Sequence, residues 1–266
     1  MMAATWLTEV AFPGPIVAAG VLARMAAAVA VGGVPIAVGV GFRVQAAVVI
    51  ALTLAAVPAA GAVMPATSLD SQPLVLLVMA EAIVGLVLGM AVATVLSAAS
   101  WAGGILGSAT GLSWSDDFTP EGDPQTAGMA RLAWWMGLAG FLAAGGHLHV
   151  VAGLVDSVRL LPIGTACGAD GRWSASLETI ATTMPSVAIS LAISLAVPAL
   201  AAVLAFHLVA AICVRTVQFD PGQGLLQAAA SLVLLVAVCI GIDSWIGGFA
   251  AVVEAPLERC LHDVRP

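Results

Sequence analysis

The chain has 266 residues, of which 61% are hydrophobic and only 9% are charged, and its mean hydropathy is +1.10. A soluble domain needs roughly a quarter of its residues charged to cover its surface, so this composition excludes one and indicates a polytopic membrane protein. The net charge of −7 and the absence of lysine leave no basic stripe for phosphate backbones, which excludes nucleic-acid binding. We therefore expect an all-α membrane protein whose partners are lipid or protein.

Six apolar runs of membrane length follow one another along the chain, with polar residues between them. They cover residues 11–31, 44–64, 74–111, 128–161, 176–214 and 225–255. Because only short connections separate these runs, they predict one integrated helical domain. If all six crossed the bilayer, the eight arginines would divide four against four between its two sides, so the positive-inside rule gives no orientation.

The third and fifth runs are too long for a simple crossing. As single helices they would measure roughly 55 to 60 Å, whereas the hydrocarbon core of a bilayer is about 30 Å thick. Irregular backbone exposed to lipid would leave amide groups unpaired, so each run must tilt, bend, or leave the lipid while buried in protein. These lengths predict an assembly subunit or a re-entrant pore.

Small residues recur at four-residue intervals in the third run. Gly85 and Gly89 begin the pattern, and Gly103 and Gly107 resume it further along. Small side chains at this interval allow another backbone to approach closely, so these glycines are predicted to pack against neighbouring helices.

Hydroxyl residues repeat the same interval in the fifth run. They are Thr182, Ser186, Ser190 and Ser194. Hydroxyl groups on one helix face can form hydrogen bonds to another helix, and Pro185 and Pro198 would bend this run.

Two acids lie inside apolar segments, Glu81 near the start of the third run and Asp243 in the last run. A carboxylate in such a place costs a few kcal/mol unless it is paired or hydrated. Each acid therefore has two interpretations. Both could relay protons or ions in an ion-coupled secondary transporter, or each could be a buried anchor bonded to an arginine or to backbone amides of a neighbouring helix.

The remaining polar residues of the apolar regions predict no enzyme and no cofactor. His147 and His149 are separated by about 200° of rotation on a helix, so they cannot bind one metal ion, and His147 is expected to cap or pack near a helix end. Arg215 ends the fifth run. The sequence has no metalloprotease, hydrolase or nucleotide-binding motif, so we expect neither a catalytic residue nor a metal site.

Acidic residues concentrate in residues 110–124, between the third and fourth runs. They are Asp116, Asp117, Glu121 and Asp123. The segment could be a solvated connection, because proline and glycine form turns and carboxylates avoid lipid. It also contains Trp114 and Phe118, which one helical turn would place on the same face. Calcium binding is a third possibility, although the acids lack the alternation of an EF-hand loop.

Several motifs stand out along the chain: RMAAAVAVGGVPIAVGVGFRVQAAVVIALTLAAVP, EAIVGLVLG, WAGGILGSATGLSW, GHLHVVAGLVDSVRLLPIG and PALAAVLAFHLVAAICVR. Together they resemble those of the FliR/SctT family of type III export-gate proteins, and the resemblance covers most of the chain. The fourth is the most specific, because His147, Ser157, Pro162 and Gly164 all match in order.

The resemblance implies a non-enzymatic FliR-like subunit in the bacterial inner membrane, at the flagellar basal body. It implies stacked helical hairpins in one domain over residues 1–266, with helical segments in 1–165 and a C-terminal hairpin in 174–256. The implied partners are FliP-type and FliQ-type gate subunits, together with FlhB-type and FlhA-type proteins and unfolded export substrates.

In this family, the loop after the G-L-S motif supplies a plug that closes the protein-conducting channel. By resemblance, the plug lies near residues 111–124. It would be formed by Gly111, Leu112, Trp114 and Phe118.

The sequence departs from the family pattern in two places. Asp117 stands where an aromatic residue is usual, and the N-R-x-x-P-Q motif of the last hairpin becomes VRTVQFDP, with Arg215 kept and its proline displaced to Pro221. The G-L-S-W and L-P-I-G motifs favour the flagellar branch over the injectisome branch.

Overall fold

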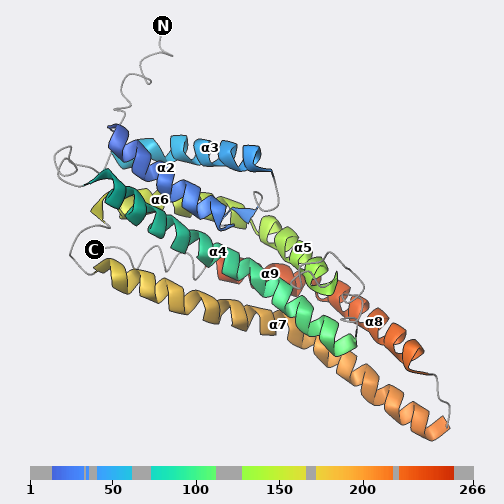
Figure 1. Ribbon diagram of the computed structural model, residues 1–266. Helices are drawn as coiled ribbons and strands as arrows, with labels where there is room; N and C mark the ends of the chain where they lie inside the picture. Colours follow the sequence, from blue (N-terminus) through green and yellow to red (C-terminus); the bar gives the residue numbers. More distant parts are fainter. Residues whose placement is uncertain are drawn as a thin grey trace. The chain divides into compact units, whose positions relative to one another are not determined.

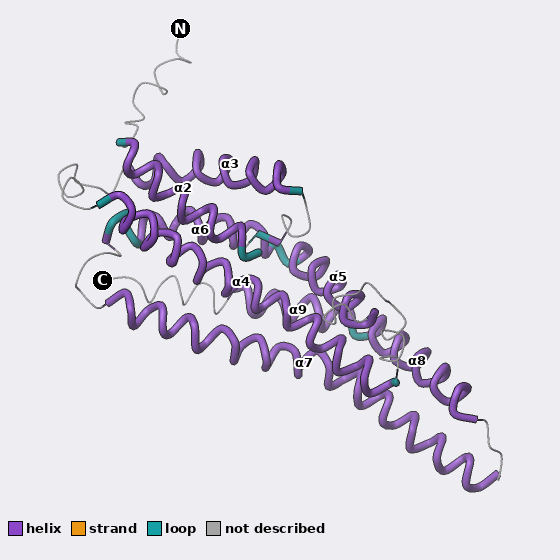
Figure 2. Tube along the Cα trace, in the orientation of Figure 1, coloured by secondary structure: helices purple, strands orange, loops and turns teal. Residues whose placement is uncertain are grey.

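A computed structural model describes residues 14–32, 34–35, 41–61, 73–111, 128–165, 172–217 and 222–254. Within these ranges every regular element is a helix (Figure 2). The helices are α2 (Pro15–Ala30), α3 (Phe42–Gly61), α4 (Leu74–Thr110), α5 (Gly128–Ala143), α6 (Gly146–Leu160), α7 (Arg172–Val217), α8 (Gly222–Ile240) and α9 (Ile242–Glu254). The all-α fold class predicted from composition is confirmed.

Two of the six apolar runs are each divided into two helices, which corrects the expectation of one helical segment per run. The fourth run breaks between α5 and α6 at Gly145, whose φ of +73° lies in the left-handed region that favours glycine. The amide of Gly145 donates to the carbonyl of Leu142 at 3.0 Å, which closes the end of α5. The last run breaks between α8 and α9 at Gly241, whose amide still donates to the carbonyl of Ala237 at 2.9 Å.

The two overlong runs, by contrast, are unbroken helices. Helix α4 has 37 residues and α7 has 46, and α7 continues through Pro185 and Pro198. By length and composition, α3, α4, α8 and most of α7 could cross a membrane, and α5 with α6 could form one bent span. The described residues therefore hold four or five candidate spans, as a polytopic membrane protein requires.

The chain divides into two compact units, and α4 and α7 contribute residues to both. The first unit contains α2, α3, α6 and the residues of α4 up to Thr94 (Figure 1). Helix α3 packs against both α2 and α6. The second unit contains the rest of α4, together with α5, α8, most of α9 and α7 from Ser186 onward. The single domain expected from the sequence stays a prediction.

In the first unit, α2 and α4 run parallel and nearly touch. A Cβ atom built on Gly85 would lie 2.9 Å from the Cα of Arg24, and one on Gly89 would lie 2.5 Å from the carbonyl oxygen of Ala28. These contacts advance along both helices together, which fixes the parallel direction. Glycine is needed at both positions because real Cβ atoms essentially never come within 3.0 Å of such neighbours.

In the second unit, the same helix packs against α5 in the opposite direction. A Cβ on Gly103 would lie 2.9 Å from the Cα of Ala130, and one on Gly107 would lie 3.2 Å from the Cβ of Met129. The contact therefore moves toward the start of α5 as it moves toward the end of α4. The glycine stripe of α4 thus serves two partners, α2 with its first pair and α5 with its second.

The hydroxyl stripe of α7 does not pack as predicted. Ser186, Ser190 and Ser194 lie on an exposed face. The hydroxyl of Ser190 donates to the carbonyl of Val187, and that of Ser194 donates to the carbonyl of Leu191, both at 2.8 Å. The expected bonds to another helix are replaced at these two positions by bonds within α7, because a short hydroxyl side chain easily reaches the preceding turn.

We predict that Gly85→Ala destabilises the protein by about 1–3 kcal/mol, because the added methyl group forces the backbones of α2 and α4 apart. Gly104→Ala is the matched control on the same helix, since a Cβ there would meet nothing within 4 Å. It should be neutral or stabilising by up to about 1 kcal/mol, because alanine favours helix more than glycine does. Denaturant unfolding in detergent measures both. Equal stability of the two variants would contradict the close-packing argument.

Candidate functional site

A buried arginine lies at the centre of the first unit. The buried residues of α2 follow a helical period, and Arg24 takes its place among them. They are Val17, Gly20, Val21, Arg24, Met25, Ala28 and Val29. The side chain of Arg24 is 0% exposed, although every other member of this face is apolar or glycine. A guanidinium in such surroundings must find partners for its charge and for its five N–H groups.

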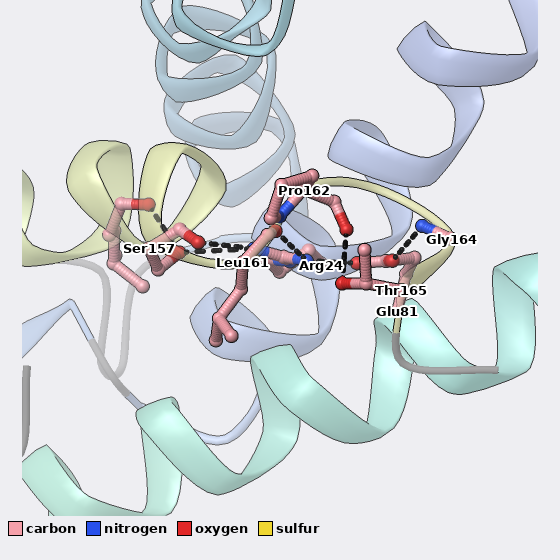
Figure 3. Close-up of polar contacts among 8 residues, drawn as sticks. Arg24, Glu81, Ser157, Leu161, Pro162, Gly164 and Thr165 are labelled. Carbon is pink, nitrogen blue, oxygen red and sulfur yellow. Dashed lines mark hydrogen bonds and ion pairs between the residues drawn. The ribbon is translucent and has the colours of Figure 1, made fainter. Parts of the chain in front are cut away.

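Arg24 finds these partners on two other helices (Figure 3). Its Nε donates to Oε2 of Glu81 at 2.8 Å, and its Nη2 donates to the same oxygen. Its Nη1 donates to the carbonyl of Ser157 at 2.8 Å, and Nη2 also donates to the carbonyl of Leu161 at 3.0 Å. Glu81 is 0% exposed too, so the two residues form an ion pair that is completely removed from solvent.

The carbonyl groups that receive these bonds belong to the end of α6. The carbonyl of Ser157 also accepts the amide of Leu161 at 3.0 Å, whereas the last carbonyls of a helix generally lack a partner within it and carry the negative end of its dipole. The next residue after Leu161 is Pro162, which has no amide hydrogen and so cannot continue the helix. Arg24 therefore caps the C-terminal end of α6 from a different helix. Its positive charge lies at the negative end of the α6 dipole, which is a favourable position.

The Leu-Pro-Ile-Gly turn, residues 161–164, completes the network. The amide of Gly164, whose φ is +90°, donates to Oε1 of Glu81 at 2.9 Å. The turn is closed by Thr165, whose amide and hydroxyl both donate to the carbonyl of Pro162. Ile163 is 1% exposed and packs so closely that a Cβ on Gly20 would lie 2.6 Å from its Cγ2.

This site joins three helices and a turn through one ion pair. We call it the Arg24 network, and it consists of Arg24, Glu81, Ser157, Leu161 and Gly164. Both carboxylate oxygens of Glu81 accept bonds from fixed donors, as a buried anchor requires. The relay interpretation of Glu81 gains no support from this geometry.

Comparison with known families identifies the chain. The family described as "Bacterial export proteins, family 1" matches residues 16–251, a range that contains the whole Arg24 network. The chain belongs to this family. It is a membrane protein of a bacterial export apparatus, and the family corresponds to the FliR/SctT resemblance seen in the sequence. No curated protein matched the chain.

In this export protein, Asp243 and Arg215 lie at helix ends. Asp243 is exposed in the first turn of α9, and Arg215 is exposed in the last turn of α7. A negative charge near the start of a helix and a positive charge near its end both interact favourably with the helix dipole. These positions give a structural reason for charged residues at the ends of apolar helices, and the relay interpretation of Asp243 stays a hypothesis.

His147 lies at the start of α6 and is half-buried. Its Nδ1 atom is buried and accepts or donates no hydrogen bond within the described part of the export protein. Across those same residues, no three histidine, cysteine or acidic side chains are grouped as a metal site would require. We find no chemical role for His147 in this arrangement.

Of the predicted plug residues, Leu112, Trp114 and Phe118 lie outside the described residues. Gly111 is described and directly follows the last residue of α4, with φ at +71°. Its carbonyl accepts a hydrogen bond from Nε2 of Gln227, on α8, at 2.6 Å.

The part of the site that sequence reasoning missed is Arg24 as the partner of Glu81. A signal was available, since Gly20, Arg24 and Ala28 are spaced four residues apart in α2, like Glu81, Gly85 and Gly89 in α4. Two helices that each carry such a series of small residues are predicted to pack closely together. Arg24 and Glu81 belong to these two series, so close packing brings their side chains near each other.

We predict that Arg24→Met destabilises the export protein by about 3–5 kcal/mol, because it leaves Glu81 charged and unpaired in the interior. The control is Arg159→Met on α6. Arg159 is 60% exposed and pairs at 3.2 Å with Asp156 on the surface, and such pairs contribute about 0–1 kcal/mol. Denaturant unfolding in detergent compares the two. If both variants lost the same small amount, the Arg24 network would not hold the fold.

Proposed function

We propose that this protein is a FliR-type subunit of the flagellar-type protein export gate in the bacterial inner membrane, at the flagellar basal body. In this proposal, the subunit has no catalytic step. It packs with FliP-type and FliQ-type subunits around a protein-conducting channel, next to FlhB-type and FlhA-type proteins, and unfolded export substrates pass through. The energy for transport comes from other parts of the apparatus.

The observation that carries this proposal is the apolar surface of α4. The helix has 37 residues and a mean hydropathy of 2.5 along its candidate span. It is therefore about 55 Å long, and even at a tilt of about 40°, the upper end of the usual range, it rises about 42 Å. A bilayer core of about 30 Å cannot cover that length.

Both ends of α4 nevertheless expose large apolar side chains. Leu74, Val75 and Leu76 are 51–68% exposed at its start, and Trp101 and Ile105 are 43% and 41% exposed toward its end. Apolar surface beyond the bilayer would face water unless protein covered it. A subunit enclosed by other chains would have such a surface covered, so these side chains support the assembly proposed above.

The buried polar groups of the protein also suit a mechanical role. In the Arg24 network, the charged atoms are used to hold α2, α4 and the end of α6 together. A subunit whose buried charges are used for packing can carry a movable segment at a different helix end. We place that segment after Gly111, with Leu112, Trp114 and Phe118 as the plug. The G-L-S-W and L-P-I-G motifs support the flagellar branch.

We expect the double variant Trp114→Ala/Phe118→Ala to make the assembled closed gate leak ions, because two large apolar side chains no longer fill the channel. Ion conductance across a bilayer that contains the purified complex measures this. Trp135→Ala is the control, since it removes a 56% exposed tryptophan of α5 that lies outside the proposed plug. Unchanged conductance of the double variant in an assembled gate would refute the plug.

The assembly itself is tested by purification in mild detergent, followed by native mass spectrometry. A heteromeric ring that contains one copy of this chain is the expected result. A homo-oligomer, or a monomer that transports ions alone, would refute the gate and favour a transporter.

A further inference from the structure

We infer that Gln227 is a positioning residue that fixes the direction in which the chain leaves α4 at Gly111. The inference concerns two residues of the second unit that are distant in sequence, one at the end of α4 and one in α8. The contact between these residues does not depend on the proposed function. Only its effect on the plug does, because the proposed plug begins at this helix end.

The geometry at Gly111 is unusual in two respects. Its φ of +71° turns the chain out of the helix, and its amide donates to the carbonyl of Ser108 at 3.3 Å. The outward carbonyl then meets Nε2 of Gln227 at 2.6 Å. The backbone angle favours glycine at this position, and a Cβ there would lie 2.4 Å from Nε2 of Gln227, so a larger residue would push the amide group of Gln227 away.

One bond to this carbonyl fixes more than one atom. The carbonyl of Gly111 and the amide of the next residue share a planar peptide group. When Gln227 holds the oxygen, it therefore restrains the orientation of this peptide plane at the end of α4. The rest of the last turn is already held, because the hydroxyl of buried Thr110 donates to the carbonyl of Leu106 at 2.9 Å.

Gln227 is itself well placed to act as a fixed support. Its helix buries one face, which contains Ala230, Leu234 and Val238. Gln227 precedes Ala230 by three residues and so extends this same face by one turn. The hydroxyl of Ser231 donates to the carbonyl of Gln227 at 2.8 Å within α8. The amide group is thus presented from a packed helix and not from a loop.

The consequence is a link between the C-terminal helices and the base of the proposed plug. As long as α8 stays packed, Gln227 holds the Gly111 carbonyl at the end of α4. A shift of α8 would break this bond. Under the proposed function, the base of the plug would in this way depend on the packing of α8.

The test compares three variants in the assembled gate. Gln227→Met keeps the length of the side chain but cannot donate, and Gln227→Lys restores a donor. Gln223→Met is the control, because Gln223 is exposed one turn earlier on the same helix. Hydrogen–deuterium exchange is measured on the peptide that contains residues 108–118, and ion conductance is measured on the same samples.

In Gln227→Met we expect the amides at the end of α4 to exchange about two- to tenfold faster than in wild type, because the last turn opens more easily by the factor that one hydrogen bond contributes, and we expect the gate to leak. Gln227→Lys should return toward wild type, and Gln223→Met should not differ from it. If Gln227 acted only through the packing of its side chain, lysine would not restore the wild-type exchange. Exchange in Gln227→Met equal to that of wild type overturns the inference.

The plug variant separates this failure from failure of the proposed function. If Trp114→Ala/Phe118→Ala leaks while Gln227→Met changes neither exchange nor conductance, the plug stands and the role of Gln227 is wrong. If the plug variant does not leak, the plug is wrong, and the exchange rates alone decide whether Gln227 fixes Gly111.

Discussion

The first unit of this export protein depends on a single ion pair between Arg24 and Glu81. Neither residue has any exposed side-chain surface, so each charge has lost its hydration and must be compensated within the protein. The compensation comes from each other and from backbone groups of the α6 end and the turn that follows. Because a buried pair repays its desolvation only when the geometry is correct, this interaction selects one arrangement of the helices more than it adds stability.

The glycine stripe of α4 makes this selection possible. Gly85 brings the two backbones together at Arg24 itself, and Glu81 lies one turn earlier on α4. With a larger residue in place of Gly85, the helices would separate and the guanidinium would no longer reach its partners in this geometry. Close packing and charge pairing therefore support each other, and neither can change independently. The same combination of polar bonds and small residues is typical of helix association where water is absent.

Much of this fold could be predicted from the chain. Hydropathy predicted α3, α4 and α7 nearly to their ends, because a long apolar run in lipid has few alternatives to helix. The breaks at Gly145 and Gly241 were missed, since both glycines lie in apolar sequence, where hydropathy does not change. The four-residue spacing identified the packing glycines of α4, but spacing alone cannot name the partner helix.

The candidate site was predicted less completely. Glu81 stood out because an acid is costly in apolar sequence, and the anchor interpretation describes the bonds that it makes. Arg24 was less evident, because the pairing joins residues 57 positions apart and depends on the parallel approach of α2 and α4. Backbone partners such as the Gly164 amide and the Leu161 carbonyl carry no signal in the sequence at all, since every residue has such groups.

The Arg24 network also has a consequence for the order of synthesis. The chain is made from its N-terminus, so Arg24 exists long before its partners: Glu81 follows 57 positions later, Ser157 follows 133 positions later and Leu161 follows 137 positions later. Helix α2 is therefore made with an arginine whose partners do not yet exist, and until they do its charge must be satisfied by water or by other groups. Glu81 supplies the opposite charge first, but the carbonyl of Leu161 and the amide of Gly164 come only with the Leu-Pro-Ile-Gly turn. The complete network can form only after that turn has been translated.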